Sequence, residues 1–144
     1  MTAAADTHDR GSIAVELAIL MPAFIALIVL AVVAGRLVIA QSAIDLAAHD
    51  AARTASLART ADTARPAALA AARNTLAEQG IRCLDLTVTV DVSQFQVPVG
   101  QPAFVRADLA CTVSFSDVAI PGAPGNRVLT AWFTSPLDQY RVRT

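Results

Sequence analysis

Glu16 is the residue whose setting most needs a chemical explanation. Its carboxylate stands at the start of an apolar run, residues 17–35, that contains no charged side chain. A charge inside a membrane helix costs about 2.5–3.5 kcal/mol on insertion scales, so such residues usually serve a function. The helix dipole offsets part of this cost, and a protonated α-amino group made by proteolysis just upstream would offset more. Two interpretations stay open: solvation of Glu16 at the membrane interface, or pairing with a new amine.

Cys83 and Cys111 are the two cysteines of the chain. They do not suffice for a structural zinc site, and the two histidines, His8 and His49, lie far away in sequence. A disulfide would stabilise the fold by about 3 kcal/mol or slightly more in the chain-entropy model, and it would require an oxidising compartment. We favour the disulfide over two buried thiols, because the apolar run indicates export.

Other kinds of chemistry find no support in the sequence. It contains no nucleophile motif, no glycine-rich phosphate loop and no metal-ligand spacing. Its net charge is −1, its arginines are scattered and lysine is absent, whereas nucleic-acid binding needs clustered cations. We therefore expect no enzyme activity, cofactor, metal, nucleic acid or small-molecule substrate.

The apolar run has the length of a membrane span. Its 19 residues would form about 28 Å of helix, which matches the hydrocarbon thickness of a bilayer. A cleaved signal peptide is one alternative, with Val32 and Ala34 as the small residues before a cut at Gly35. An ordinary single-span anchor is another. A buried core helix fits poorly with this length and apolarity.

The residues around Glu16 form a motif. In RGSIAVEL, residues 10–17, a polar leader ends in Gly11, and Glu16 is the fifth residue after it. A glycine and a glutamate at this spacing become specific when a spanning-length apolar helix follows. The pattern resembles a type IV prepilin or pseudopilin N-terminus, most closely that of the TadE-like minor pseudopilins of tight-adherence pilus systems. The resemblance covers roughly the first third of the chain and continues in Pro22, Gly35-Arg36 and the stretch AAHDAAR at residues 47–53.

The resemblance implies processing followed by assembly. A prepilin peptidase would cut between Gly11 and Ser12, and Glu16 would pair with the new amine of Ser12 on a neighbouring subunit. The implied partners are the prepilin peptidase, other pilin or pseudopilin subunits, and the pilus assembly platform. The chain would be a single-pass protein of the cytoplasmic membrane, with its C-terminal domain outside the cytoplasm and at the surface in a pilus.

Helical periodicity continues beyond the apolar run. A narrow stripe of small and apolar residues recurs at three- and four-residue steps; it consists of Leu37, Ala40, Ile44, Ala47, Ala51, Ala55 and Ala58. Pro66 disfavours helix at Arg65 and suits the first turn of a new helix. A second helix is therefore predicted from Pro66 to Gln79, with Gly80 as its C-cap residue. We expect His49 to be solvated.

From Cys83 onward the period changes to two, which predicts strands. The first covers residues 84–92, the second carries alternate apolar residues from Val105 to Phe115, the third lies near residues 127–134, and a short fourth includes Tyr140 and Val142. Turns are predicted at residues 98–102 and 120–126. Cys83 and Cys111 fall on opposite parities, so a direct disulfide needs a β-bulge or places Cys83 in the preceding loop.

The aromatic neighbours Trp132 and Phe133 lie in an alternating strand, so one of them points outward. An exposed aromatic residue would mark a contact surface, but we expect it to pack under the C-terminal segment. The predicted fold class is α+β and pilin-like, with an N-terminal transmembrane helix, a helical stalk and a small antiparallel sheet of three or four strands. Its parts are a leader at 1–11, a membrane helix at 12–35, a stalk at 36–80 with a break near 60–66, and a sheet domain at 81–144. Because other anchored domains share this plan, a binding or accessory domain without a filament role stays an alternative.

Overall fold

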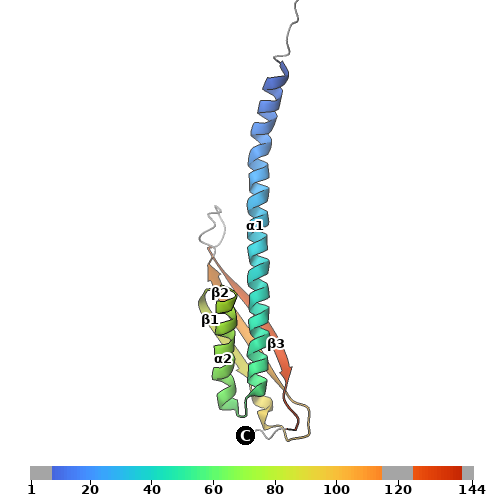
Figure 1. Cartoon of the computed structure of the whole chain (residues 1–144), viewed down its shortest axis with the longest axis vertical. Coiled ribbons are helices and arrows are strands. Elements are labelled where there is room, and N and C mark those ends of the chain that lie inside the picture. Colours follow the sequence, from blue (N-terminus) through green and yellow to red (C-terminus); the bar gives the residue numbers. More distant parts are fainter. Residues whose placement is uncertain (1–7, 115–124, 141–144) are drawn as a thin grey trace, which may run out of the picture. The chain divides into compact units, whose positions relative to one another are not determined.

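The computed structural model describes residues 8–114 and 125–140, and within them the side chains from Val15 onward. The elements follow in the order α1 (His8–Leu57), α2 (Ala61–Glu78), β1 (Cys83–Asp91), the 3₁₀ turn η1 (Ser93–Gln96), β2 (Phe104–Ser114) and β3 (Asn126–Pro136) (Figure 1). The chain divides into two compact units between Leu37 and Val38. The predicted α+β class, with a long apolar helix followed by a small antiparallel sheet, is confirmed.

The first unit contains the N-terminal part of α1. Among the described residues, α1 is the one helix that is long and apolar enough to cross a membrane. No other part of the described chain covers its large apolar side chains between Val15 and Leu30. This exposure is expected of a helix that lies in lipid or packs against other proteins. Pro22 lies inside this helix. Since proline has no N–H, the carbonyl four residues earlier, at Ala18, loses its helical donor.

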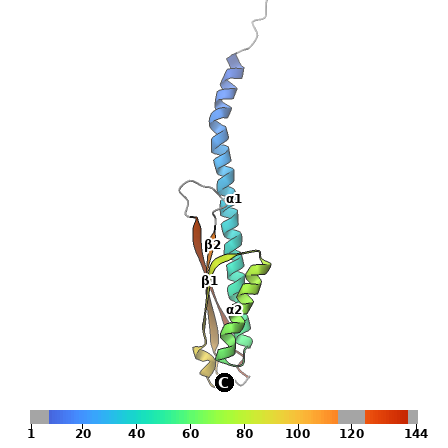
Figure 2. The ribbon, with the colours of Figure 1, turned by 90° about the vertical axis from the view of Figure 1, so that its left-hand side faces the viewer.

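The second unit packs two helices against one face of a sheet (Figure 2). The sheet is an antiparallel meander in the order β1-β2-β3. The Nε2 group of Gln41 on α1 donates a hydrogen bond to the carbonyl of Thr130 on β3 at 3.1 Å. The hydroxyl of Thr75 on α2 donates to Asp50 Oδ2 on α1 at 2.8 Å. These bonds tie α1 to the sheet edge and to α2.

Alanine forms most of the helical side of the core. The predicted stripe on α1 is buried from Ala40 through Ala55, with Ile44 fully enclosed at its centre, whereas Leu37 and Ala58 at its ends are half-buried. Small side chains let two backbones approach closely, and larger residues of the sheet then fill the space. The buried alanines of the two helices are Ala40, Ala43, Ala47, Ala48, Ala51, Ala52, Ala55, Ala64, Ala68 and Ala72.

The second helix begins earlier than predicted. It starts at Ala61, so Arg65 and Pro66 lie within it, and the interruption after α1 falls at residues 58–60 rather than near 60–66. Thr60 caps the helix by accepting a hydrogen bond from the Thr63 N–H at 3.2 Å. This cap and the burial of Ala64 outweigh the donor that Pro66 removes.

The end of α2 agrees with the prediction. Gly80 has φ +70°, and its N–H donates to the Ala77 carbonyl at 3.0 Å. The Ile81 N–H donates to the Leu76 carbonyl at 2.9 Å. Together these bonds form a Schellman motif, in which a left-handed glycine satisfies the last carbonyls of the helix.

The three predicted strands are present, and the connection between the first two contains an additional 3₁₀ turn. The Ser93 N–H donates to Asp91 Oδ1 at 2.9 Å. That backbone hydrogen bond, with a smaller contribution from the Ser93 side chain, lowers the pKa of Asp91. The proposed fourth strand is not seen at Tyr140, which lies in a turn, and Val142 lies outside the described residues. Phe115 and the predicted loop at 120–124 also lie outside them.

Candidate functional site

The residues of the predicted processing motif lie in the first turns of α1. Gly11 and Ser12 have helical backbone, because α1 begins at His8. Glu16 follows Ser12 by four residues, which on a helix is one turn along the same face. The Glu16 side chain is exposed within the chain. Backbone geometry therefore places the predicted cleavage bond one turn before this carboxylate.

Apolar side chains surround α1 immediately after Glu16. Leu17, Ile19 and Phe24 are each more than half exposed, and no part of the described chain covers them. A shallow apolar depression on this surface is lined by Leu17, Leu20, Met21, Ala23, Phe24 and Leu27. The segment thus combines one carboxylate with a surface suited to lipid tails or to other apolar helices.

The structure joins the two cysteines and resolves the conflict between their parities. A disulfide links Cys83 to Cys111. The register of β1 against β2 shifts between Cys83 and Asp85, because Cys83 pairs with Val113 and Asp85 with Thr112. A β-bulge therefore leaves Leu84 as the extra residue, 63% exposed. The bulge turns Cys83 toward the buried face that carries Cys111, as the parity argument required for a direct bridge.

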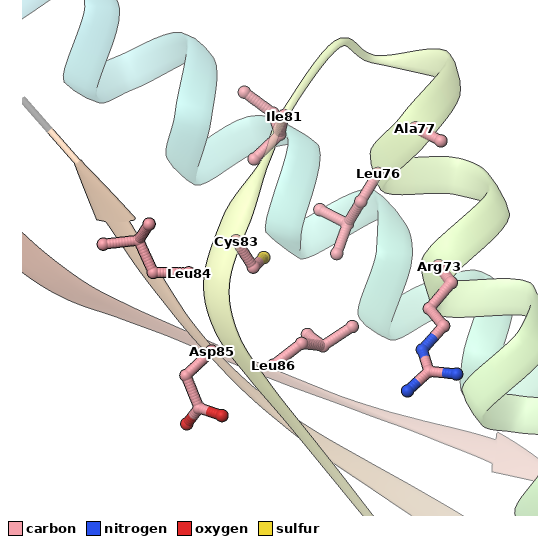
Figure 3. Close-up of a pocket in the computed structure, with 8 residues that line it drawn as sticks. All are labelled: Arg73, Leu76, Ala77, Ile81, Cys83, Leu84, Asp85 and Leu86. Carbon is pink, nitrogen blue, oxygen red and sulfur yellow. The ribbon is translucent and has the colours of Figure 1, made fainter.

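A surface depression of about 390 Å³ lies beside this disulfide, between the C-terminal turns of α2 and the first residues of β1 (Figure 3). Leu76 of α2 and Leu86 of β1 point into the space between these elements, while the Asp85 carboxylate points away from the helix. Cys83 is oxidised, so its sulfur offers no nucleophile. The lining residues are Arg73, Leu76, Ala77, Ile81, Cys83, Leu84, Asp85 and Leu86. This set offers packing surface and no arrangement for acid–base or nucleophilic chemistry.

His49, which we expected to be solvated, is half-exposed, and its side chain keeps 43% of its accessible surface. Its ring packs edge-on against Phe133, with ring centroids 4.6 Å apart. Its Nδ1 atom lies 3.3 Å from Asp50 Oδ1. The same Asp50 carboxylate accepts the Thr75 hydroxyl hydrogen bond, so this cluster joins α1, α2 and β3. The His49 ring is partly covered because Phe133 faces the helices. No group of three or more possible ligands in the described part of the chain could hold a metal ion.

Trp132 occupies the opposite face of the sheet. It is 61% exposed within the described residues, whereas we expected it to pack under the C-terminal segment. The Arg106 guanidinium carbon lies 4.4 Å from the centroid of its ring. Hydrogen bonds from Arg106 to the Asp108 carboxylate raise the pKa of Arg106. Sequence reasoning found the alternation of Trp132 and Phe133 but missed this cluster, although Arg106, Asp108 and Trp132 share one parity across paired strands.

Comparisons with known proteins agree with the N-terminal motif. Residues 11–53 match the family model described as TadE-like protein. The match begins at Gly11, contains Ser12, Glu16 and the apolar run, and ends at Arg53 after the alanine-rich stretch; it covers 43 of the 144 residues. The resemblance predicted from the sequence is thereby confirmed. No curated protein and no solved structure matches the chain.

Proposed function

We propose that this TadE-like chain is a structural subunit, a minor pilin or pseudopilin, for assembly of a tight-adherence or related type IV-like pilus. It is made as a prepilin and held in the membrane by α1. The observation that carries this proposal is the family match over residues 11–53, which contains the predicted cleavage bond, Glu16 and the whole apolar run. The exposed apolar surface of α1 and the separately folded unit that begins at Val38 are the two parts that such a subunit needs.

Cleavage after Gly11 gives assembly a physical basis. The leader carries the charged residues Asp6, Asp9 and Arg10, which favour a helix end that stays at the membrane surface. Its removal leaves one amine on Ser12 and one carboxylate on Glu16. In lipid each charge is costly alone, whereas a pair held between packed helices compensates both. Transfer of the subunit from lipid into a filament therefore becomes more favourable after processing.

The proposed partners follow from these steps. A prepilin peptidase acts on the Gly11–Ser12 bond, other pilin or pseudopilin subunits contact α1, and the assembly platform moves the subunit out of the membrane. The second unit lies outside the cytoplasm, where its disulfide is stable. No step in this proposal needs a catalytic group from the chain itself.

The mature N-terminus tests the proposal directly. We expect the full chain, recovered from its native membrane and surface fractions, to begin at Ser12 by intact and peptide mass. A Gly11→Val variant should keep its leader, because the added side chain blocks a peptidase pocket shaped for glycine. Gly35→Val is the matched control: a Cβ at Gly35 meets no heavy atom within 4 Å, so this variant should be cleaved normally.

Two other results would overturn the proposal. A native chain that keeps the residues before Ser12 would be an ordinary anchor, and the accessory-domain alternative would then hold. A chain that begins near Gly35 would identify a signal peptide and a secreted second unit.

A further inference from the structure

The open face of the sheet is organised in rungs that cross all three strands. α1 and α2 cover the other face (Figure 2). Strand pairing places Thr87, Ala110 and Thr130 in one rung, and Thr89, Asp108 and Trp132 in the next. Four of these six side chains carry a hydroxyl or a carboxylate, one is a single methyl group, and one is an indole.

Trp132 is held in place on this face. Arg106, one rung further along the strands, lies over the ring at 4.4 Å. Asp108 fixes that arginine, because Nε and Nη2 of Arg106 donate to its carboxylate oxygens at 2.7–3.0 Å. The arginine and the aspartate neutralise each other and orient the indole. An aromatic surface ordered before binding loses little conformational entropy when a ligand stacks on it.

A depression of about 290 Å³ lies over these two rungs, with Trp132 among its lining residues. It lies over Ala110, whose small side chain leaves space between the flanking strands. Thr87, Thr89, Thr130, Asp108 and Trp132 line it, whereas Arg106 does not. The site therefore has an aromatic wall, three hydroxyl groups, and one carboxylate that is paired with Arg106.

We propose that this depression binds a neutral carbohydrate. A sugar ring presents C–H groups on its face, which are attracted to the electron-rich face of an indole. It presents hydroxyl groups around its rim, which both donate and accept hydrogen bonds. Threonine hydroxyls and an aspartate carboxylate match that rim, and a few placed polar groups beside an aromatic surface are typical of ligand sites.

Charge distinguishes this ligand from other classes. No cation lines the depression, so nothing there would pair with the charge of a phosphate or an acidic sugar. A basic ligand would have to compete with Arg106, which already holds the same carboxylate in a bidentate pair. An uncharged polyhydroxylated ligand meets neither obstacle. This site goes beyond the proposed function and does not rest on it.

Tryptophan fluorescence gives a specific assay, because Trp132 is the one tryptophan in the chain. The full chain is titrated in phosphocholine micelles, since detergents with a sugar head group would themselves be ligands. The probes are maltohexaose, cellohexaose, mannohexaose and hexa-N-acetylchitohexaose, with hexagalacturonate as the anionic comparison. We expect a saturable change with at least one neutral hexasaccharide, with a Kd below about 1 mM, and at least tenfold weaker binding of hexagalacturonate.

Variants test the site without removing the reporter. Ala110→Leu fills the depression and should weaken binding at least tenfold, and Thr130→Val, which removes one hydroxyl, should weaken it about threefold. Val128→Ala is the matched control. Val128 is 60% exposed and lies on β3, on the same face as Thr130 and Trp132, but it does not line the depression. It should bind as the parent does. Unchanged unfolding midpoints show that each variant is folded.

Several results would overturn the proposal. One is the absence of a saturable change with any neutral probe. Another is equal binding by the parent, Ala110→Leu and Thr130→Val, and a third is equal weakening by Val128→Ala. If Ala110→Leu instead changes the self-association of the chain or its retention of a protein, with no neutral probe bound, the face is a protein interface and the carbohydrate assignment is wrong.

Discussion

At the scale of single residues, Glu16 is a carboxylate directly before an apolar helix of membrane-spanning length. Its side chain is exposed within the chain, and the apolar run that follows contains no cation. The nearest charge that processing can supply is the amine of Ser12, one helical turn away. Within one subunit that amine also takes part in the first turn of the helix. We therefore propose that the two charges pair between neighbouring subunits.

Replacing Glu16 by alanine should separate insertion from assembly. We expect Glu16→Ala to stay in the membrane after carbonate extraction, because the change removes a cost of about 2.5–3.5 kcal/mol. We also expect at least about tenfold less of the chain in the sheared surface fraction, since loss of 1.4 kcal/mol in subunit pairing already has that effect.

Conservative variants make the interpretation of Glu16 more specific. Glu16→Asp keeps the charge and should retain part of the assembly, whereas Glu16→Gln keeps the shape and should behave as alanine does. Normal surface amounts of Glu16→Ala would contradict the pairing hypothesis and leave solvation at the membrane interface as the role of Glu16.

At the scale of elements, the disulfide is the strongest constraint on the sheet. It closes a loop across a sequence separation of 28 residues and joins β1 to the middle of the sheet. For a loop of this length the chain-entropy model gives about 3.5 kcal/mol. The helical side of the core is mostly alanine, which buries little apolar area per residue, so this contribution is a large share of the stability.

Loss of the disulfide should therefore lower the free energy of unfolding by about 3.5 kcal/mol. The double variant Cys83→Ser, Cys111→Ala removes the disulfide and places no hydroxyl at the fully buried position 111. Urea unfolding of the full chain in micelles, followed by Trp132 fluorescence, measures the difference. The parent chain after reduction is the control and should give a similar value. An unfolding midpoint that does not change on reduction would show that the disulfide contributes nothing.

The sheet also shows which structural features the sequence predicted and which it could not predict. Alternation predicted the three strands, and the opposite parities of Cys83 and Cys111 indicated a bulge. The residue that the bulge displaces, Leu84, depends on the pairing register with β2, which no local pattern specifies. In the same way, alternation showed that one of Trp132 and Phe133 points outward. Which one it is depends on the sheet face that the helices cover.

The start of α2 was missed for a different reason. The rule that proline begins a helix describes an average preference, and it favoured a start at Pro66. The cap lies six residues earlier, at Thr60, which accepts from the Thr63 N–H, and Ala64 is buried against the rest of the unit. Burial of the alanine face then stabilises a helix that tolerates one missing hydrogen bond. The Thr60 cap is a local signal that the sequence contains and that the proline rule obscured, whereas the burial of Ala64 was not available from the sequence.

At the scale of the whole molecule, the open question is the direction in which the chain crosses the membrane. Arginines stand on both sides of the apolar run, with Arg10 before it and Arg36 directly after it. The positive-inside rule counts such residues near the ends of a span, so it gives no strong preference here. The disulfide does, because a bond between Cys83 and Cys111 persists in an oxidising compartment and is reduced in the cytoplasm.

We therefore predict that the second unit lies outside the cytoplasmic membrane. In spheroplasts from expressing cells, added protease should remove peptides from residues 38–144 and leave a protected fragment that contains residues 17–35. A cytoplasmic marker that stays intact controls for lysis. A second unit digested only after lysis would contradict this orientation. Cys83 and Cys111 would then be reduced in the cell, because they would face a reducing compartment. The prediction of the orientation and the presence of the disulfide in the cell therefore depend on each other. The carbohydrate site can be tested on the isolated chain whichever orientation is found.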